Sequence, residues 1–260
     1  MSTSVEPRAD LSWEEQAGVT VARLIYRERR LNLVGTPGLA ALEAAFDELS
    51  ACSDLRVVVL SGGGHRAFIG GADIGEMATL EPVGARRFIT RLHGICERIR
   101  NLPVPVVARI EGYCLGAGLE LAACCDLRLA ASGARFGMPE VRVGIPSVIE
   151  AALLPRLIGL GRAQDLVLTG RMVDAEEARR IGLVDTVVES GAALDALVDQ
   201  RVDELASGSP RALADQKELI RRWQELPLSA AIEAGIDAFE RSWETTEPVE
   251  RMQAFLARKR

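Results

Sequence analysis

The stretch 105–122, Pro-Val-Val-Ala-Arg-Ile-Glu-Gly-Tyr-Cys-Leu-Gly-Ala-Gly-Leu-Glu-Leu-Ala, carries a strand, a turn and the start of a helix. Residues 106–110 form a short apolar run between a proline and a glycine, which predicts a buried strand. The small residues of 112–118 lead into an apolar helix, and another buried strand is expected at 126–130. This alternation indicates an α/β fold with mostly parallel strands.

The same alternation extends toward the N-terminus. Residues 19–26 predict a strand, and Thr36-Pro37 offers an N-cap with proline at the first helical position, so a helix is expected to about Ala51. A buried strand is expected at 56–60. The amphipathic helix that follows is marked by apolar residues at helical spacing: Phe88, Leu92, Ile95, Ile99 and Leu102.

Helices dominate after residue 130. Ser147-Val-Ile-Glu150 matches a capping box and Asp174-Ala-Glu-Glu177 matches another helix N-terminus. A strand is expected at 183–188, and four helical segments follow, near 191–207, 210–224, 228–243 and 247–258. We expect an α/β core over 1–190 that carries the site, and a helical region over 191–260 that packs on this core or on a neighbouring subunit.

The composition restricts the possible functions. Among 260 residues, 37 acidic side chains outnumber 31 basic ones, giving a net charge of −6 that disfavours nucleic-acid binding by bulk attraction. The chain has two histidines, His65 and His93, and two lysines, Lys217 and Lys259. A site built on several histidines or on a Schiff-base lysine therefore has few candidates, so carboxylates and backbone amides are the expected catalytic groups.

Cysteine usage and hydropathy indicate a cytoplasmic protein. The five cysteines are odd in number and show no C-x-x-C spacing, which is typical of reduced core thiols. The first ten residues do not resemble a secretory signal. The most apolar stretch, 115–125, is too short for a membrane span and contains Glu120, so no membrane partner is expected.

Two glycine-rich segments follow predicted strands: 61–72, which contains two glycine clusters, and 112–118. Gly62, Gly64 and Ala67 formally match the dinucleotide fingerprint, but no helix opens inside the motif, so the match is weak and a flexible turn is an equal reading. The second cluster, 70–72, precedes an expected helix over 73–80, where backbone N–H groups can approach a ligand oxygen. The turn at 112–118 offers the same chemistry, although from this segment alone a close helix–strand contact is the favoured reading.

Two carboxylates are candidates for proton transfer. Glu120 lies inside the apolar segment Leu-Glu-Leu-Ala-Ala-Cys-Cys, where an unpaired charge is costly. Glu140 follows Phe136-Gly-Met-Pro, whose proline fixes the approach of the chain. A buried glutamate with a raised pKa can move protons near neutral pH. A capping or salt-bridged role stays open for each residue.

Taken together, these segments resemble the enoyl-CoA hydratase/isomerase (crotonase) family over nearly the whole chain. The similar motifs are Ala67-Phe-Ile-Gly-Gly-Ala-Asp73, the stretch 105–122, the segment Phe136 to Pro146, and Leu168 to Ala178 with Gly182-Leu-Val. Several ordered motifs are more specific than any single one. The resemblance implies a spiral of ββα units, a helical C-terminal region, and a homo-oligomer that is a trimer or a dimer of trimers.

The resemblance also implies roles for particular residues. The backbone amides of Ala72 and Ala117 match the oxyanion-hole positions that hold the thioester carbonyl of an acyl-CoA. Glu120 and Glu140 match the two catalytic glutamates of hydratases, and retention of both favours the addition of water to a 2-enoyl-CoA. Glu140 would donate the proton to the α-carbon and Glu120 would orient or deprotonate the water. This chemistry needs no metal and no redox cofactor, so neither is expected. Coenzyme A enters only as part of the substrate.

Further residues match substrate-binding positions of the family. Arg29, Arg30 and Arg66 are expected near the entrance for the anionic CoA, although a solvated surface position explains each of them equally well. The other residues expected to bind substrate lie on the two glycine-rich turns: Ala67, Phe68, Gly70, Gly71, Asp73, Ile74 and Gly116.

The sequence departs from the family at 147–150, where Ser-Val-Ile-Glu stands in place of a glycine-rich run. Bulkier Val148 and Ile149 are expected to reshape the acyl pocket, and Glu150 is either the capping-box acid, which we favour, or an extra carboxylate near the site. Three alternatives stay open: a Δ3,Δ2-enoyl-CoA isomerase, a non-catalytic RNA-binding or scaffold relative, and a nicotinamide oxidoreductase.

Overall fold

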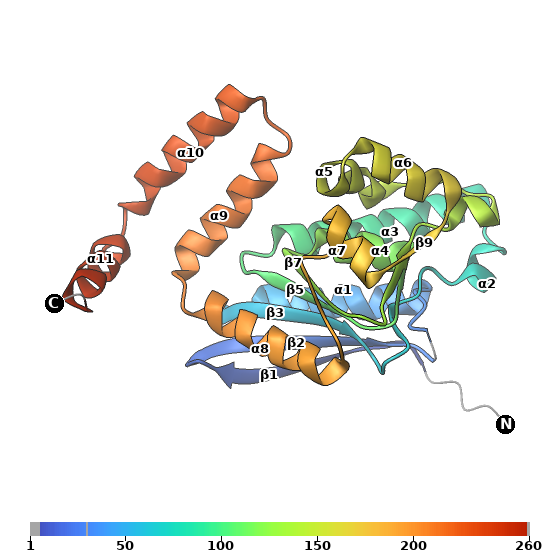
Figure 1. Cartoon of the computed structure of the whole chain (residues 1–260), viewed down its shortest axis with the longest axis horizontal. Helices are drawn as coiled ribbons and strands as arrows, with labels where there is room; N and C mark the ends of the chain where they lie inside the picture. The colour runs from blue at the N-terminus through green and yellow to red at the C-terminus, as the bar shows by residue number, and fades with distance from the viewer. Residues whose placement is uncertain (1–5, 30, 259–260) are drawn as a thin grey trace.

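The computed structural model describes residues 6–29 and 31–258, the side chain of residue 258 excepted (Figure 1). Its larger sheet has six strands in spatial order β1 (Arg8–Gln16), β2 (Val19–Arg27), β3 (Leu55–Gly62), β5 (Val106–Ile110), β7 (Leu127–Ala131) and β10 (Thr186–Val188). The smaller sheet contains β4 (Ala67–Ile69), β6 (Tyr113–Leu115), β8 (Arg135–Gly137) and β9 (Met172–Asp174). Only the β1–β2 and β8–β9 pairs are antiparallel among the described strands, so the predicted α/β fold with mostly parallel strands is confirmed.

The helices cover both faces of the larger sheet and continue beyond it. The helical elements are α1 (Thr36–Ala51), α2 (Ile74–Met77), α3 (Pro82–Asn101), α4 (Ala117–Cys124), the 3₁₀ turns η1 (Glu140–Val143) and η2 (Ile149–Leu153), α5 (Leu154–Ile158), α6 (Leu160–Thr169), α7 (Ala175–Ile181), α8 (Gly191–Ala206), α9 (Pro210–Trp223), α10 (Leu228–Ser242) and α11 (Glu247–Arg258). The predicted N-cap at Thr36 is wrong by one residue, because Gly35 caps α1. The helix expected over 73–80 is shorter, and Asp73 caps it.

The central strands are buried on both faces. In β3, Val58 and Leu60 face the core formed with α1, α3 and α4, whereas Val57 and Val59 face the opposite side. That opposite side is covered by α8 through Val198 and its neighbours. A strand buried on both faces needs apolar residues at successive positions, which explains its continuous hydrophobic run.

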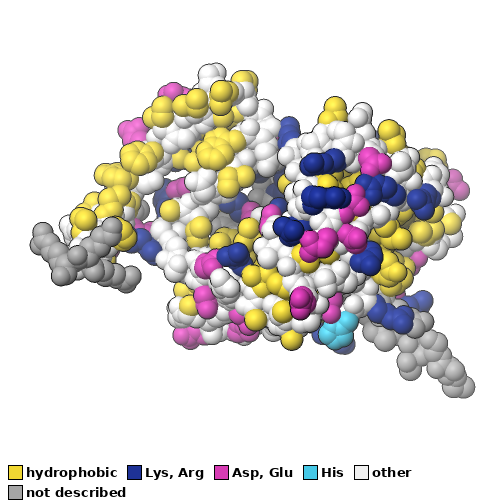
Figure 2. All heavy atoms as spheres, viewed as in Figure 1, with side chains coloured by type: hydrophobic (Ala, Val, Ile, Leu, Met, Phe, Trp, Pro, Cys, Tyr) yellow, Lys and Arg dark blue, Asp and Glu magenta, His cyan; other side chains and the backbone are white. Residues whose placement is uncertain are grey.

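The C-terminal helices leave the core after α9. Lys217 on α9 forms an ion pair with Asp126 at 2.8 Å and donates to the carbonyls of Ile99 and Val104 at 3.0 and 2.9 Å. Beyond this anchor, α10 and α11 extend away from the α/β body (Figure 1). Apolar side chains line this arm in Figure 2. The described part of 191–260 therefore packs on the core through α8 and α9, and leaves a large apolar surface on α10 and α11.

The cysteines agree with the reduced-thiol prediction. All five are free; four are buried and Cys52 is half-buried. Among the described residues, no helix is both long and apolar enough to cross a membrane.

Candidate active site

The two glycine-rich turns lie side by side at the carboxyl ends of parallel strands β4 and β6. A methyl group built on Gly71 would lie 3.4 Å from the carbonyl oxygen of Leu115. One built on Gly118 would lie only 2.0 Å from the carbonyl oxygen of Ile69, so glycine is required for this approach. The close helix–strand contact favoured from the sequence is therefore present, and it also brings the two turns together.

The backbone N–H of Ala72 points away from the neighbouring strand segment. Val34 forms an isolated parallel bridge with Ala72: it donates to the carbonyl of Gly71 at 2.9 Å and accepts from Asp73 at 3.0 Å. Because successive N–H groups alternate in direction along an extended segment, the Ala72 N–H faces the other side. It donates to no group within the described residues.

The backbone N–H of Ala117 is the first of helix α4. Amides of the first helical turn have no intrahelical acceptor, and the Ala117 N–H has no other partner in the described part of the chain. Its predecessor Gly116 has a φ of +50°, which favours glycine, and donates to the carbonyl of Gly137 at 2.9 Å. Each turn thus supplies one unpaired amide donor.

Glu120 lies on helix α4, one turn after the Ala117 amide. Its side chain is 5% exposed, and its Oε1 accepts a hydrogen bond of 3.1 Å from the Ala151 N–H. The pKa of Glu120 is raised to about 8: burial is the main cause, the hydrogen bond from the Ala151 N–H opposes it, and the nearby charges of Glu140 and Glu150 add to it. A carboxyl group with this pKa can gain or lose a proton near neutral pH.

Glu140 begins η1 and reaches the start of α4. A methyl group built on Gly116 would lie 2.5 Å from Oε1 of Glu140, so this carboxylate lies against the turn that presents the Ala117 amide. Its other oxygen, Oε2, accepts a hydrogen bond of 2.8 Å from the Ser147 hydroxyl. The structure therefore brings both predicted glutamates and the predicted oxyanion-hole turn into one region.

The predicted capping box at 147–150 is wrong. Val148 precedes η2 without any side-chain cap, and the Ser147 hydroxyl bonds Glu140 instead. Glu150 is 4% exposed, and its Oε1 lies 2.8 Å from Nδ1 of His93 on α3. Both polar side chains of the motif thus contact the site region, and Glu150 is the extra carboxylate that the sequence allowed as the second reading.

The remaining predicted binding residues have varied positions. Arg66 and Ile74 are exposed, whereas Ala67 and Phe68 are buried on β4. Gly70 is half-buried beside the Leu31 carbonyl. The carboxylate of Asp73 accepts from the Gly75 and Glu76 amides, so it serves as an N-cap. Arg29 is exposed and pairs with Glu28 at 3.5 Å, and the prediction for Arg30 lies outside the described residues.

One buried polar residue that shapes the site was not predicted. The Asn32 side chain donates from Nδ2 to the carbonyls of Ala67 and Phe68 at 2.7 and 3.2 Å. Its Oδ1 accepts from the Glu28 N–H at 3.0 Å. Asn32 therefore fixes β4 just before the Ala72 turn. The only sequence signal was a polar residue between two leucines.

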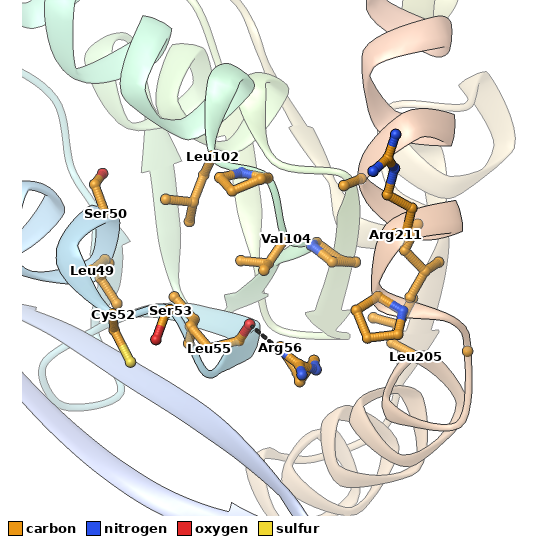
Figure 3. Close-up of a pocket in the computed structure, with 16 residues that line it drawn as sticks. Leu49, Ser50, Cys52, Ser53, Leu55, Arg56, Leu102, Val104, Leu205 and Arg211 are labelled. Atoms are coloured by element: carbon orange, nitrogen blue, oxygen red, sulfur yellow. Dashed lines mark hydrogen bonds between the residues drawn. The ribbon is translucent and has the colours of Figure 1, made fainter. Parts of the chain in front are cut away.

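A pocket of about 310 Å³ lies away from these residues (Figure 3). Leu49, Leu55, Leu102, Val104 and Arg211 are among the residues that line it, and the predicted catalytic residues are not. The candidate site is therefore defined by the glutamates and the unpaired amides rather than by this pocket.

The described residues also bring Cys96, Cys124 and Glu150 together, with their ligand atoms within 4.8 Å of one another. Hydrogen bonding to Cys124 and burial raise the pKa of the Cys96 thiol, which favours the protonated form that donates a hydrogen bond. The dinucleotide reading has no support from the fold, because the segment after Gly62 enters β4 and opens no helix there.

Comparisons with known proteins agree with this fold. The model of the family "Enoyl-CoA hydratase/isomerase" matches residues 14–260. The short-chain-enoyl-CoA hydratase of Clostridium acetobutylicum is 32% identical over 247 residues, which cover 95% of this chain and 94% of that protein. The crystal structure of an enoyl-CoA hydratase from Bacillus anthracis superposes with a TM-score of 0.90 at 31% identity, covering 96% of both chains.

The architecture is thus the crotonase fold, two sheets with C-terminal helices. The chain belongs to the enoyl-CoA hydratase/isomerase family. A second solved structure, the enoyl-CoA hydratase of Mycobacterium smegmatis, has a TM-score of 0.91 at 30% identity and covers 97% of both chains.

Proposed function

We propose that this protein hydrates 2-enoyl-CoA thioesters to 3-hydroxyacyl-CoA. The observation that carries the proposal is the convergence of Glu120 and Glu140 beside the turns that present the Ala72 and Ala117 amides. Two backbone donors suit the oxyanion that develops on a thioester carbonyl as the double bond is attacked. The hydratases among its relatives support the same reaction.

In the proposed mechanism the two amides polarise the thioester C=O, and one proton is shared by the glutamate pair. In the free protein this proton lies on Glu120, whose pKa is raised to about 8, and it passes to Glu140 as the substrate binds. Deprotonated Glu120 accepts a proton from the water as the water oxygen bonds the β-carbon. Protonated Glu140 donates its proton to the α-carbon, and the enolate collapses to the thioester. The pair then again holds one proton, which returns to Glu140 before the next turnover. The net change is the addition of one water.

The substrate is expected to carry a short or branched acyl group. Val148 and Ile149 stand where the family resemblance leads us to expect glycines. The side chain of Ile149 packs against the core, two residues before the Ala151 N–H that bonds Glu120. We expect turnover to fall as the acyl chain lengthens from four carbons, measured across short, branched, aromatic and long 2-enoyl-CoA thioesters with mass detection of the hydrated product. Inactivity on every thioester would contradict the hydratase proposal. Conversion of 3-enoyl to 2-enoyl thioesters without hydration would instead identify an isomerase.

We also propose that the apolar arm packs against further copies of the chain in a trimer or a dimer of trimers. The exposed apolar residues supporting this are Leu228, Ile232, Ile236, Phe239, Trp243, Val249, Met252 and Leu256. A single chain would leave this surface in water, which monomeric proteins rarely do. Light scattering measures the assembly mass, and a single-chain mass at micromolar concentration would contradict this.

A further inference from the structure

Glu150 is a buried carboxylate that the proposed mechanism does not use. Its Oε1 lies 2.8 Å from Nδ1 of His93, and its Oε2 has no hydrogen-bond partner among the described residues. Burying a carboxylate with an unsatisfied oxygen is costly, so its presence calls for a physical explanation. His93 is the one basic side chain of the described residues that contacts it, and its ring is 47% exposed.

The residue after Glu150 holds Glu120. The Ala151 N–H belongs to the peptide plane that joins residues 150 and 151, and it donates to Oε1 of Glu120 at 3.1 Å. Because a peptide unit is planar and rigid, anchoring the Glu150 side chain restricts the direction of this N–H. His93 therefore contacts the residue that directly precedes Ala151 in the chain, and the Ala151 N–H is the group that bonds the proposed catalytic residue Glu120.

The turn that contains these residues is strained. Ile149 has a φ of +41°, in the left-handed region that a β-branched side chain rarely adopts. Such a conformation persists only where surrounding contacts enforce it. The turn is held on both sides, by the Ser147 hydroxyl on Glu140 and by the Glu150 carboxylate on His93.

We propose that His93 and Glu150 form a positioning dyad, which ties the 147–151 turn to α3 and thereby aims the Ala151 amide at Glu120. This inference rests on the proposed hydration at the same site. Neither residue of the dyad needs to touch the substrate, so their effect is on the orientation and charge of Glu120.

The dyad also places a charge near Glu120. The titratable groups that face Glu150 come from α3 and α4, and they are His93, Cys96, Glu97, Glu120 and Cys124. The negative charge of Glu150 raises the pKa of Glu120. Removing this charge while keeping the packing should lower the pKa of Glu120 and move the pH profile of the hydration rate to lower pH. Removing the packing alone should not move the profile.

The test uses the full chain with three substitutions, assayed for hydration of a 2-enoyl-CoA across pH. Glu150→Ala and His93→Phe should each lower kcat by about 10- to 100-fold, the cost of a misplaced catalytic group, at nearly unchanged KM. Glu150→Gln keeps an acceptor for His93, so it should retain most of the kcat while moving the pH profile to lower pH. Glu15→Gln removes an exposed carboxylate on β1 that lies outside this cluster, so it is the control and should leave both the kcat and the pH profile unchanged.

An NMR measurement separates the dyad from the reaction. In the wild type the Ala151 amide signal should move as Glu120 titrates, and this pH dependence should disappear in His93→Phe. If both Glu150→Ala and His93→Phe keep the wild-type kcat and the Ala151 titration, the dyad proposal is overturned. If Glu150→Ala does not fold, His93→Phe and the pH profile of Glu150→Gln decide. An inactive wild type contradicts only the proposed function, because the amide titration still tests the dyad.

Discussion

Replacing Glu120 or Glu140 by glutamine is expected to lower the kcat of hydration by about 10²- to 10⁴-fold, the usual contribution of a positioned acid or base. Glutamine has nearly the shape of glutamate but cannot take up or release the proton. In Glu120→Gln the side-chain carbonyl can still accept from Ala151. In Glu140→Gln it can still accept from the Ser147 hydroxyl. The loss therefore measures proton transfer rather than collapse of the site.

The two substitutions should leave KM nearly unchanged, because the amides of Ala72 and Ala117 are untouched. The double variant should lose little more than either single one, since residues that act as a unit give non-additive effects. Glu111→Gln removes another half-buried carboxylate and serves as the matched control. Decay of the conjugated enoyl-thioester absorbance measures the rates, and wild-type rates in both single variants would show that the assignment is wrong.

Glu120→Gln is also expected to stabilise the fold at alkaline pH. The pKa of Glu120 rises from its ordinary 4.5 to about 8 on folding, because burial penalises the charged form. The stability gained from the neutral carboxyl group is complete below pH 4.5 and is lost as the pH rises to about 8. Glutamine does not titrate, so the free-energy advantage of the variant should grow across this window to the order of a few kcal/mol.

Denaturant unfolding measures this difference in the free energy of unfolding. Wild type and Glu120→Gln are compared at a fixed protein concentration and at several pH values across this window. Glu15→Gln on the exposed face of β1 is the control, and its difference from wild type should not depend on pH. A constant difference between Glu120→Gln and wild type would mean that Glu120 keeps an ordinary pKa in the folded protein. The proposed proton transfer near neutral pH would then lose its physical basis.

Elements governed by local pattern could be predicted from the sequence. The strand at 106–110 and the helix that ends at Ala51 follow from apolar runs and helical spacing, which need no distant partner. Strand β1 was missed because Arg8–Gln16 is mostly polar, and only Ala9 and Leu11 pack against the core. Its antiparallel pairing with β2 makes it a strand, and pairing is not visible in the pattern of one segment.

The site was predictable only in part. Glu120 attracted attention as a charge in an apolar helix, but its proximity to Glu140 depends on the pairing of β6 with β8. Ser147 and Glu150 have the spacing of a capping box, yet their partners are Glu140 and His93, the latter 57 residues away. Local spacing cannot distinguish a cap from tertiary contacts of this kind, because both place a hydroxyl and a carboxylate at the start of a helical turn.

The most direct test of the central claim is the turnover of trans-2-butenoyl-CoA in water enriched with oxygen-18. The proposed mechanism predicts rapid loss of the conjugated absorbance in the wild type and one labelled oxygen on carbon 3 of the 3-hydroxybutanoyl-CoA product. The same label should appear far more slowly with Glu120→Gln and Glu140→Gln. Absence of labelled product from the wild type, or equal rates of labelling in all three proteins, would contradict the account.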